Sequence, residues 1–123
     1  MSEHIGHECG IALVRMLKPL AYYAEKYHSP LWGFEKLFLL MEKQHNRGQD
    51  GAGIAVVKRD MPAGEPFIDR IRSAKRSPIE RVFGEAMDPA SKLEPEDLRR
   101  LHPTELKRRI PFLGEVMLGH LRY

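Results

Sequence analysis

The sequence predicts an α+β fold in which a pair of helices covers one face of a mainly antiparallel sheet. Two patterns favour this fold class. Short apolar runs bounded by Gly, Pro and polar residues are typical of strands, and apolar residues spaced by three and four are typical of helices packed on a core. The predicted order along the chain is strand, helix, strand, strand, helices, strand.

The first strand is predicted at residues 11–14, a short and partly β-branched apolar run. A turn or short helical piece follows at 21–27. Ser29 and Pro30 predict the start of a longer helix, because a Ser side chain accepts from the free N–H groups of a first turn and Pro fits its first position. This helix is expected to end near residues 45–46. Its core-facing stripe comprises Leu31, Phe34, Leu37, Phe38 and Met41.

Residues 47–53 contain three glycines and predict a tight turn. A helix is disfavoured there, because each Gly in a helix interior costs about 1 kcal/mol relative to Ala. The turn leads into a strand at 54–57, and a loop at 60–66 connects it to a second strand at 67–72. We expect these two strands to form an antiparallel hairpin.

Helical segments fill most of the remaining sequence. Ser77 and Pro78 repeat the helix-start signal, and Glu80 stands where a capping box would place it. We expect this helix to end near Gly84, with a loop at 88–92.

Residues 94–110 are predicted helical but split near His102, since Pro103 cannot continue a helix. The final strand is predicted at 114–123, and we expect the natural domain to continue beyond it.

The composition favours one globular domain. The chain has 123 residues, of which 42% are hydrophobic and 30% charged, and a net charge of +3 is too small to indicate a nucleic-acid partner. The longest apolar run, 37–41, is too short to cross a membrane. Residues 1–8 lack the features of a signal peptide, and a single cysteine excludes a disulfide framework. These observations predict a cytoplasmic protein with a free thiol.

Cys9 is the first candidate for chemistry. A lone cysteine at a strand is commonly a small, buried and inert side chain. The alternative is a nucleophile: if the bond between Glu8 and Cys9 were cut, Cys9 would carry both a thiol and a free α-amino group. Such an amine has a pKa of about 7.7–8.0, so it can accept the proton of the thiol near neutral pH.

Three further groups of residues are candidates. His4, His7 and Cys9 have a spacing that could hold zinc or copper, although a solvated tail is the simpler interpretation. Arg47 lies beside the glycine-rich turn and could face an anion or a thiolate. Arg122 is either a surface residue or a bidentate clamp for a carboxylate.

Basic runs at 70–76 and at 107–109 could contact phosphate. Acidic residues are mixed among them, and no aromatic residues interleave to stack on bases. We therefore interpret these runs as solvated helical faces and expect no nucleic-acid partner.

Three motifs occur in order along the chain: Cys9-Gly10-Ile11, the stretch QHNRGQDGAGI at 44–54, and GHLRY at 119–123. Together they resemble the N-terminal part of a class II glutamine amidotransferase domain. Within that superfamily, RGQDGAG and the terminal RY are most similar to the amidophosphoribosyltransferases.

The resemblance implies an N-terminal-nucleophile hydrolase fold, a four-layer αββα sandwich that is incomplete in this chain. Residues 1–8 would be a leader that is removed. Residues 9–123 would be the N-terminal part of the amidotransferase domain, which continues beyond the chain.

The same resemblance assigns roles to individual residues. Cys9 matches the nucleophile, and Arg122 matches the residue that binds the α-carboxylate of glutamine. Tyr123 matches the pocket wall, whereas Arg47 and Gly48 match the loop beside the nucleophile. No metal site is implied in this segment.

The implied reaction releases ammonia from glutamine through a cysteine thioester. In the full enzyme a phosphoribosyltransferase domain would combine the ammonia with phosphoribosyl pyrophosphate to make phosphoribosylamine for purine synthesis. Magnesium is expected in that missing domain, and the full-length enzyme is expected to be a cytoplasmic homo-oligomer with no membrane partner. The segment alone is expected to be inactive.

The sequence departs from the family pattern at Asn46, which stands between His45 and Arg47, and at the elaborate stretch 58–113. The Asn-Gly pair of the oxyanion hole would lie beyond Tyr123. Two alternatives therefore stay open. The first is a non-catalytic relative that serves as an interaction or regulatory domain, and the second is a basic nucleic-acid-binding module.

Overall fold

The computed structural model of the protein describes residues 9–44 and 50–122. Within these ranges the chain forms four strands and five helices. In chain order they are β1 (Cys9–Arg15), α1 (Leu20–Tyr27), α2 (Trp32–Glu42), β2 (Gly51–Val57), β3 (Ile68–Ser73), α3 (Pro78–Ser91), α4 (Pro95–Arg100), α5 (Pro103–Arg109) and β4 (Val116–Arg122).

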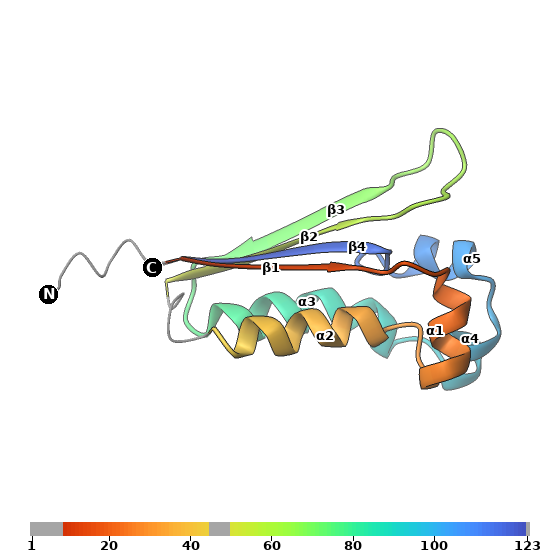
Figure 1. Cartoon of the computed structure of the whole chain (residues 1–123), viewed down its shortest axis with the longest axis horizontal. Coiled ribbons are helices and arrows are strands. Elements are labelled where there is room, and N and C mark those ends of the chain that lie inside the picture. Colours follow the sequence, from red (N-terminus) through yellow and green to blue (C-terminus); the bar gives the residue numbers. More distant parts are fainter. Residues whose placement is uncertain (1–8, 45–49, 123) are drawn as a thin grey trace, which may run out of the picture.

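The four strands form one antiparallel sheet in the order β1-β4-β2-β3. The last strand in the sequence thus lies inside the sheet, between β1 and β2 (Figure 1). The predicted hairpin of β2 and β3 is confirmed, with Val57 opposite Ile68. The α+β class and the antiparallel sheet are confirmed as well.

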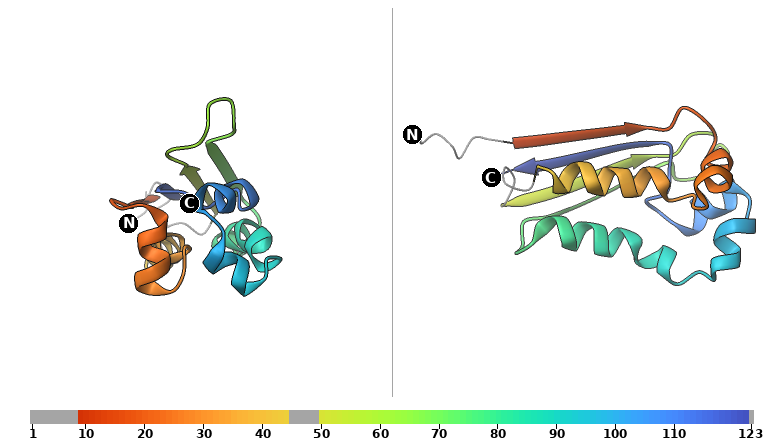
Figure 2. Two further views of the ribbon diagram at one scale, coloured as in Figure 1. Left: turned by 90° about the vertical axis from the view of Figure 1, so that its right-hand side faces the viewer. Right: turned by 60° about the horizontal axis from the view of Figure 1, so that its bottom comes forward.

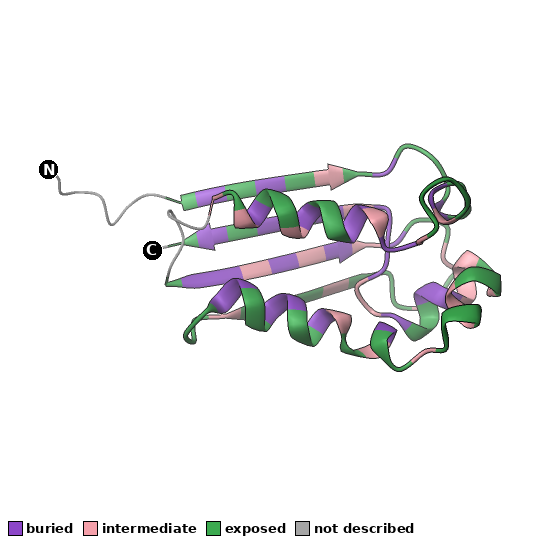
Figure 3. Ribbon diagram, turned by 90° about the horizontal axis from the view of Figure 1, so that it is seen from below, coloured by how far each residue is buried: buried purple, intermediate pink, exposed green. Residues whose placement is uncertain are grey.

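Helices α2 and α3 lie side by side against one face of the sheet (Figures 1 and 2). Because side chains alternate along a strand, every second residue of β1, β2 and β4 points to these helices and is shielded from solvent, as the burial colouring shows (Figure 3). The largest core cluster lies between sheet and helices. Its buried members include Ala12, Phe34, Leu37, Met41, Ile54, Val56, Val82, Phe83, Met117 and Leu121.

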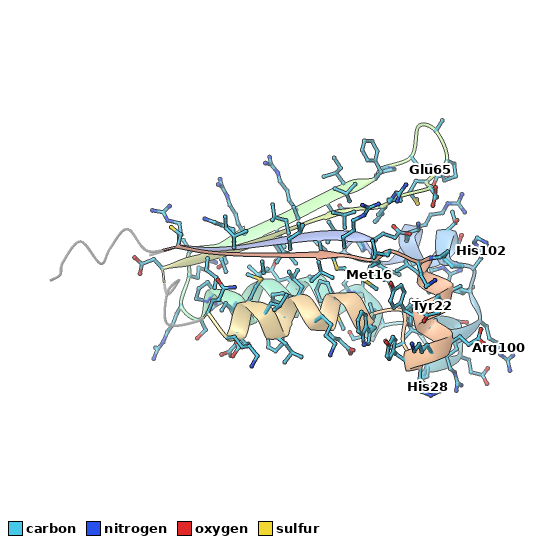
Figure 4. All side chains as sticks on the ribbon, in the orientation of Figure 1. Met16, Tyr22, His28, Glu65, Arg100 and His102 are labelled. Carbon is cyan, nitrogen blue, oxygen red and sulfur yellow. The ribbon has the colours of Figure 1, made fainter. Side chains whose placement is uncertain are left out.

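The opposite face of the sheet carries no covering layer within the described residues (Figure 4). We call it the open face. It consists of four cross-strand rows defined by the strand register. The rows are Cys9–Arg122–Gly51, Ile11–His120–Gly53–Arg72, Leu13–Leu118–Ala55–Arg70 and Arg15–Val116–Val57–Ile68.

Helices α1, α4 and α5 gather at the end of the sheet where β1 finishes and β4 begins (Figure 1). A second apolar cluster holds them together. It comprises Leu20, Leu31, Ala90, Leu106, Ile110 and Leu113. Among the helices of the described residues, none has the length and apolar character needed to cross a bilayer.

The second predicted helix is confirmed, but its boundaries differ: α2 begins at Trp32, after a cap at Leu31 rather than Ser29, and ends at Glu42, before residues 45–46. The Ser29 Oγ still accepts a hydrogen bond from the Leu31 N–H at 3.0 Å, in the turn before the helix. The break at Pro103 separates α4 from α5, and the His102 Nδ1 accepts from the Thr104 N–H at 3.1 Å.

The predicted end of α3 near Gly84 is wrong, as is the predicted loop at 88–92. The helix continues to Ser91, since its apolar stripe continues on the core side while Gly84 faces open space. The predicted capping box is also wrong, because Ser77 adopts a left-handed conformation (φ 53°) and makes no side-chain cap.

The predicted turn at 47–53 extends too far. Strand β2 already begins at Gly51, so Gly51 and Gly53 are strand residues. Both glycines lie beneath arginine side chains of neighbouring strands: a Cβ on Gly51 would lie 3.1 Å from Arg122 Cγ, and one on Gly53 would lie 3.3 Å from Arg72 Cβ. Gly51 and Gly53 therefore do not form a turn; their missing side chains leave room for the arginines of the neighbouring strands.

Candidate functional site

Cys9 and Arg122 face one another across two neighbouring strands. They are direct partners in the register of β1 and β4, and both are exposed on the open face. Directly opposed residues of antiparallel strands have Cβ atoms about 4.5–5.5 Å apart. The fold therefore places Cys9 and Arg122 at opposed positions at one end of the sheet, although they lie 113 residues apart in the sequence.

The glycine-rich segment reaches the same place from the other side of β4. Gly51 pairs with Arg122, and the Asp50 N–H donates to the Arg122 carbonyl oxygen at 3.0 Å. The stem of Arg122 lies over Gly51, since a Cβ there would be 3.1 Å from Cγ and 3.5 Å from Cδ of Arg122. The described parts of the three sequence motifs thus meet in one row.

Positive side chains predominate on the open face, with the exposed Asp50 beside the row. The open-face rows contain four arginines and no aspartate or glutamate. A surface of one charge sign attracts ligands of the opposite sign. The guanidinium of Arg122 suits a planar carboxylate. Cys9 and Arg122 thus place a nucleophilic group and a group suited to a carboxylate on one face of the sheet.

Cys9 is exposed, which contradicts the interpretation of this residue as a small buried side chain. The thiol is accessible, as a nucleophile must be.

His120 lies one row from Arg122 on the same face and pairs with Ile11 and Gly53. It was not among the predicted site residues. His120 and Arg122 are two residues apart in a predicted strand, and this spacing could have indicated from the sequence that their side chains lie on one face.

The remaining predicted site residues, Arg47, Gly48 and Tyr123, lie outside the described residues, and so do His4 and His7. Within residues 9–44 and 50–122, no three His, Cys, Asp or Glu side chains come together in a group that could hold a metal ion.

The prediction that the basic run 107–109 forms a solvated face is wrong for Lys107, which is buried. Its Nζ lies 2.8 Å from Glu115 Oε2 and donates to the Arg59 carbonyl oxygen at 2.6 Å. The interpretation of the run 70–76 as a helical face is wrong, because Arg70 and Arg72 lie on strand β3, in agreement with the strand predicted at 67–72. The burial of Lys107 arises from tertiary contacts that charge patterning alone does not reveal.

The clearest pKa shifts lie away from Cys9. Hydrogen bonds from Arg108 lower the pKa of Glu65, and hydrogen bonds from Arg109 and Arg108 lower that of Glu105. A hydrogen bond with Tyr22 raises the pKa of Lys26. All these groups lie on the surface, at the end of the sheet opposite Cys9 or on α1, so they do not tune the candidate site.

Comparisons with protein-family models, with curated proteins and with solved structures find no match to this chain.

Proposed function

We propose that this chain is the N-terminal part of a class II glutamine amidotransferase domain of the amidophosphoribosyltransferase type, with Cys9 as its nucleophile. The observation that carries the proposal is the row in which Cys9 and Arg122 stand opposite each other on the open face. The ordered motifs of the sequence suggest the family, and the row supports it because the residues that match the nucleophile and the carboxylate-binding arginine lie at opposed positions.

Glutamine carries the two groups that Cys9 and Arg122 would recognise, an α-carboxylate and a side-chain amide. Four carbon–carbon bonds of about 1.5 Å link its α-carboxylate carbon to its side-chain amide carbon, so the two ends lie up to about 5 Å apart. Arg122 would hold the α-carboxylate while the thiol of Cys9 faces the amide carbon.

The proposed reaction requires that residues 1–8 are removed, because the nitrogen of an internal Cys9 is an amide and cannot act as a base. The freed α-amino group takes the proton of the thiol, and the thiolate attacks the amide carbon of glutamine. The same amine returns the proton to the departing nitrogen, which leaves as ammonia. Water then hydrolyses the thioester to glutamate.

The open face supports the finer fold assignment, a four-layer αββα sandwich. Large apolar side chains stand exposed on it, among them Ile11 (69% exposed), Leu13 (62%) and Leu118 (45%). An apolar patch such as this one, on neighbouring strands β1 and β4, favours burial against another layer. A second sheet contributed by sequence after Tyr123 would cover these residues and enclose the row of Cys9 and Arg122.

The rest of the proposed activity belongs to a further domain. That domain would bind phosphoribosyl pyrophosphate and magnesium and would use the ammonia to make phosphoribosylamine, in a homo-oligomeric enzyme. We place the reaction in the cytoplasm, where a free thiol such as that of Cys9 stays reduced.

The proposal is tested on the natural full-length protein isolated from cells. Its N-terminus, measured by mass spectrometry, should be Cys9, and glutamine should yield ammonia and glutamate. Cys9→Ala should abolish this release. Arg122→Lys should mainly raise the KM for glutamine, because lysine cannot hold a carboxylate in a bidentate manner.

Arg70→Lys is the matched control, since Arg70 lies on the same open face but two strands away from Arg122. Its KM should equal that of the parent protein. Ammonia release by Cys9→Ala would remove Cys9 as the nucleophile. An intact N-terminus at Met1 or Ser2, with no glutaminase activity, would favour the non-catalytic relative instead.

A further inference from the structure

Among the described residues, 9–44 and 50–122, strand β1, which begins with Cys9, is an edge strand and pairs with β4 on one side only. An edge strand leaves a row of backbone groups without a strand partner. At its far end the chain is tied down just after β1, where the Met16 N–H donates to the Glu115 carbonyl oxygen at 2.7 Å. At the end that carries Cys9, a side-chain contact adds to the pairing with β4.

Gln44 supplies such a contact from the C-terminal end of α2. Its Nε2 donates to the Ile11 carbonyl oxygen at 3.3 Å and to the Leu40 carbonyl oxygen at 3.4 Å. One side-chain amide therefore joins the last turn of the helix to the edge strand, two residues after Cys9.

The same amide rests on Gly10. A Cβ on Gly10 would collide with Gln44 Oε1 and would lie 3.3 Å from Gln44 Cδ. Gly10 does not have a positive φ, so its backbone would accept another residue. The side chain of Gln44 is what demands a glycine beside Cys9.

From these contacts we propose that Gln44 is a positioning residue for Cys9. By seating its amide on Gly10 and donating to Ile11, it fixes the start of the edge strand so that Cys9 stays opposite Arg122. The residue has no contact with the thiol and acts through the backbone of its two neighbours. This inference rests on the proposed function, because only a nucleophile needs such placement for catalysis.

The test measures how well Cys9 is held opposite position 122. In the variant Arg122→Cys, the full chain contains two cysteines on paired positions of β1 and β4, where a disulfide can form. The equilibrium between this disulfide and a glutathione buffer gives the effective concentration of the two thiols.

Adding Gln44→Ala should lower this effective concentration about threefold to tenfold, the effect of losing one hydrogen bond. Gln44→Met should lower it too, because methionine keeps the length of the side chain but cannot donate to Ile11. The Met variant keeps the test decisive if the Ala variant does not fold.

Two controls separate positioning from general stability. Lys43→Ala changes the exposed neighbour of Gln44 at the same helix end, and Val82→Ala weakens the core on α3. Both should leave the effective concentration within about twofold of the parent, provided the chain stays folded.

The proposal is overturned if both Gln44 variants match the parent, or if Val82→Ala lowers the effective concentration as much as they do. Neither result involves glutamine. A failed glutaminase assay with a positive disulfide result would therefore reject the proposed function and leave the contact between Gln44 and β1 standing.

Discussion

The two ends of the sheet differ in how exposed their polar side chains are. At the cysteine end, where β1 begins and β4 finishes, Cys9 and Arg122 lie exposed on the open face. At the far end, where β2 finishes and β4 begins, Lys58, Lys107 and Glu115 are buried.

The buried charges of the far end are held by one another and by backbone carbonyls. Lys107 Nζ lies 2.8 Å from Glu115 Oε2, while Lys58 Nζ lies 3.3 Å from Asp69 Oδ2 and donates to the Lys107 carbonyl oxygen at 2.8 Å. Glu115 Oε1 also accepts from the Arg59 N–H at 2.8 Å. Polar groups engaged in this way stabilise structure and have no capacity left for a ligand. The comparison teaches that burial, more than charge or residue type, separates these structural polar groups from the exposed candidate residues Cys9 and Arg122.

The largest effect should come from breaking the buried pair at the far end. Glu115→Ala leaves Lys107 charged and buried, and breaking such a pair costs about 3–5 kcal/mol of unfolding free energy. Chemical denaturation measures this loss. The double variant Lys107→Met/Glu115→Leu should recover most of it, since both charges are then gone. A Glu115→Ala variant as stable as the parent would show that the far end does not depend on this pair.

The next largest loss of stability should come from the core-facing side of β4 rather than from its open-face side. Met117 is 1% exposed and points to the helices, whereas its neighbour Leu118 points to the open face. Met117→Ala should lower the unfolding free energy by about 2–5 kcal/mol, because it leaves a cavity in the core.

Leu118→Ala is the matched change in the same strand, and it should stay within about 0.5 kcal/mol of the parent in this chain. Thermal and denaturant unfolding measure both variants. Equal losses of unfolding free energy in the two variants would mean that Leu118 is buried in solution, and therefore that the open face is covered.

A smaller effect is expected at the cysteine end, from Gly10→Ala. The added methyl group collides with the amide of Gln44, and overpacking of this kind costs about 1–3 kcal/mol. Gln44→Ala should relieve the collision, because the Gln44 Cβ would lie 3.5 Å from the new Cβ, an ordinary contact. A double-mutant cycle measures this coupling, and strictly additive losses would contradict it.

The smallest effect concerns the exposed contact between the β2–β3 loop and α5 (Figure 4). Arg108 Nε and Nη2 donate to the two carboxylate oxygens of Glu65 at 2.8 and 2.9 Å. These bonds hold the pKa of Glu65 below its ordinary value of 4.5. The contact therefore stabilises the fold above that pH, and its contribution disappears as the pH falls through the lowered pKa.

An NMR titration of the Glu65 carboxyl group measures this pKa directly. Arg108→Ala should raise it toward its ordinary value, whereas Arg100→Ala, which removes a charge from α4, should leave it unchanged. If the pKa of Glu65 is the same in the two variants, the contact between Glu65 and Arg108 is not formed in solution.

Local patterns predicted the elements well where side-chain periodicity and breaker residues agree. The stripe of α2, the split at Pro103 and the hairpin of β2 and β3 all follow from sequence. The errors occur where a tertiary contact overrides a local signal. Gly84 was expected to end a helix, but it faces solvent while its neighbours pack on the core, so the helix continues.

The pairing that builds the candidate site could not be predicted from periodicity. Alternation places Arg122 on one face of a strand, yet it does not say that β4 inserts between β1 and β2. That insertion brings Cys9, Gly51 and Arg122 into one row. The order of the motifs predicted that these residues belong together, and the strand order supplies a physical reason. Similarly, nothing in the charge pattern of 107–109 indicated that Lys107 is buried.

Covalent capture of the nucleophile tests the central claim most directly. The diazoketone analogue of glutamine, incubated with the natural full-length protein, should add one label, and peptide mapping should place it on Cys9 as the N-terminal residue. Excess glutamine should protect the thiol, and Arg122→Lys should slow the labelling. Labelling of Cys9 that glutamine does not slow, or no labelling of Cys9 at all, would contradict the proposal that Cys9 and Arg122 form a glutaminase site.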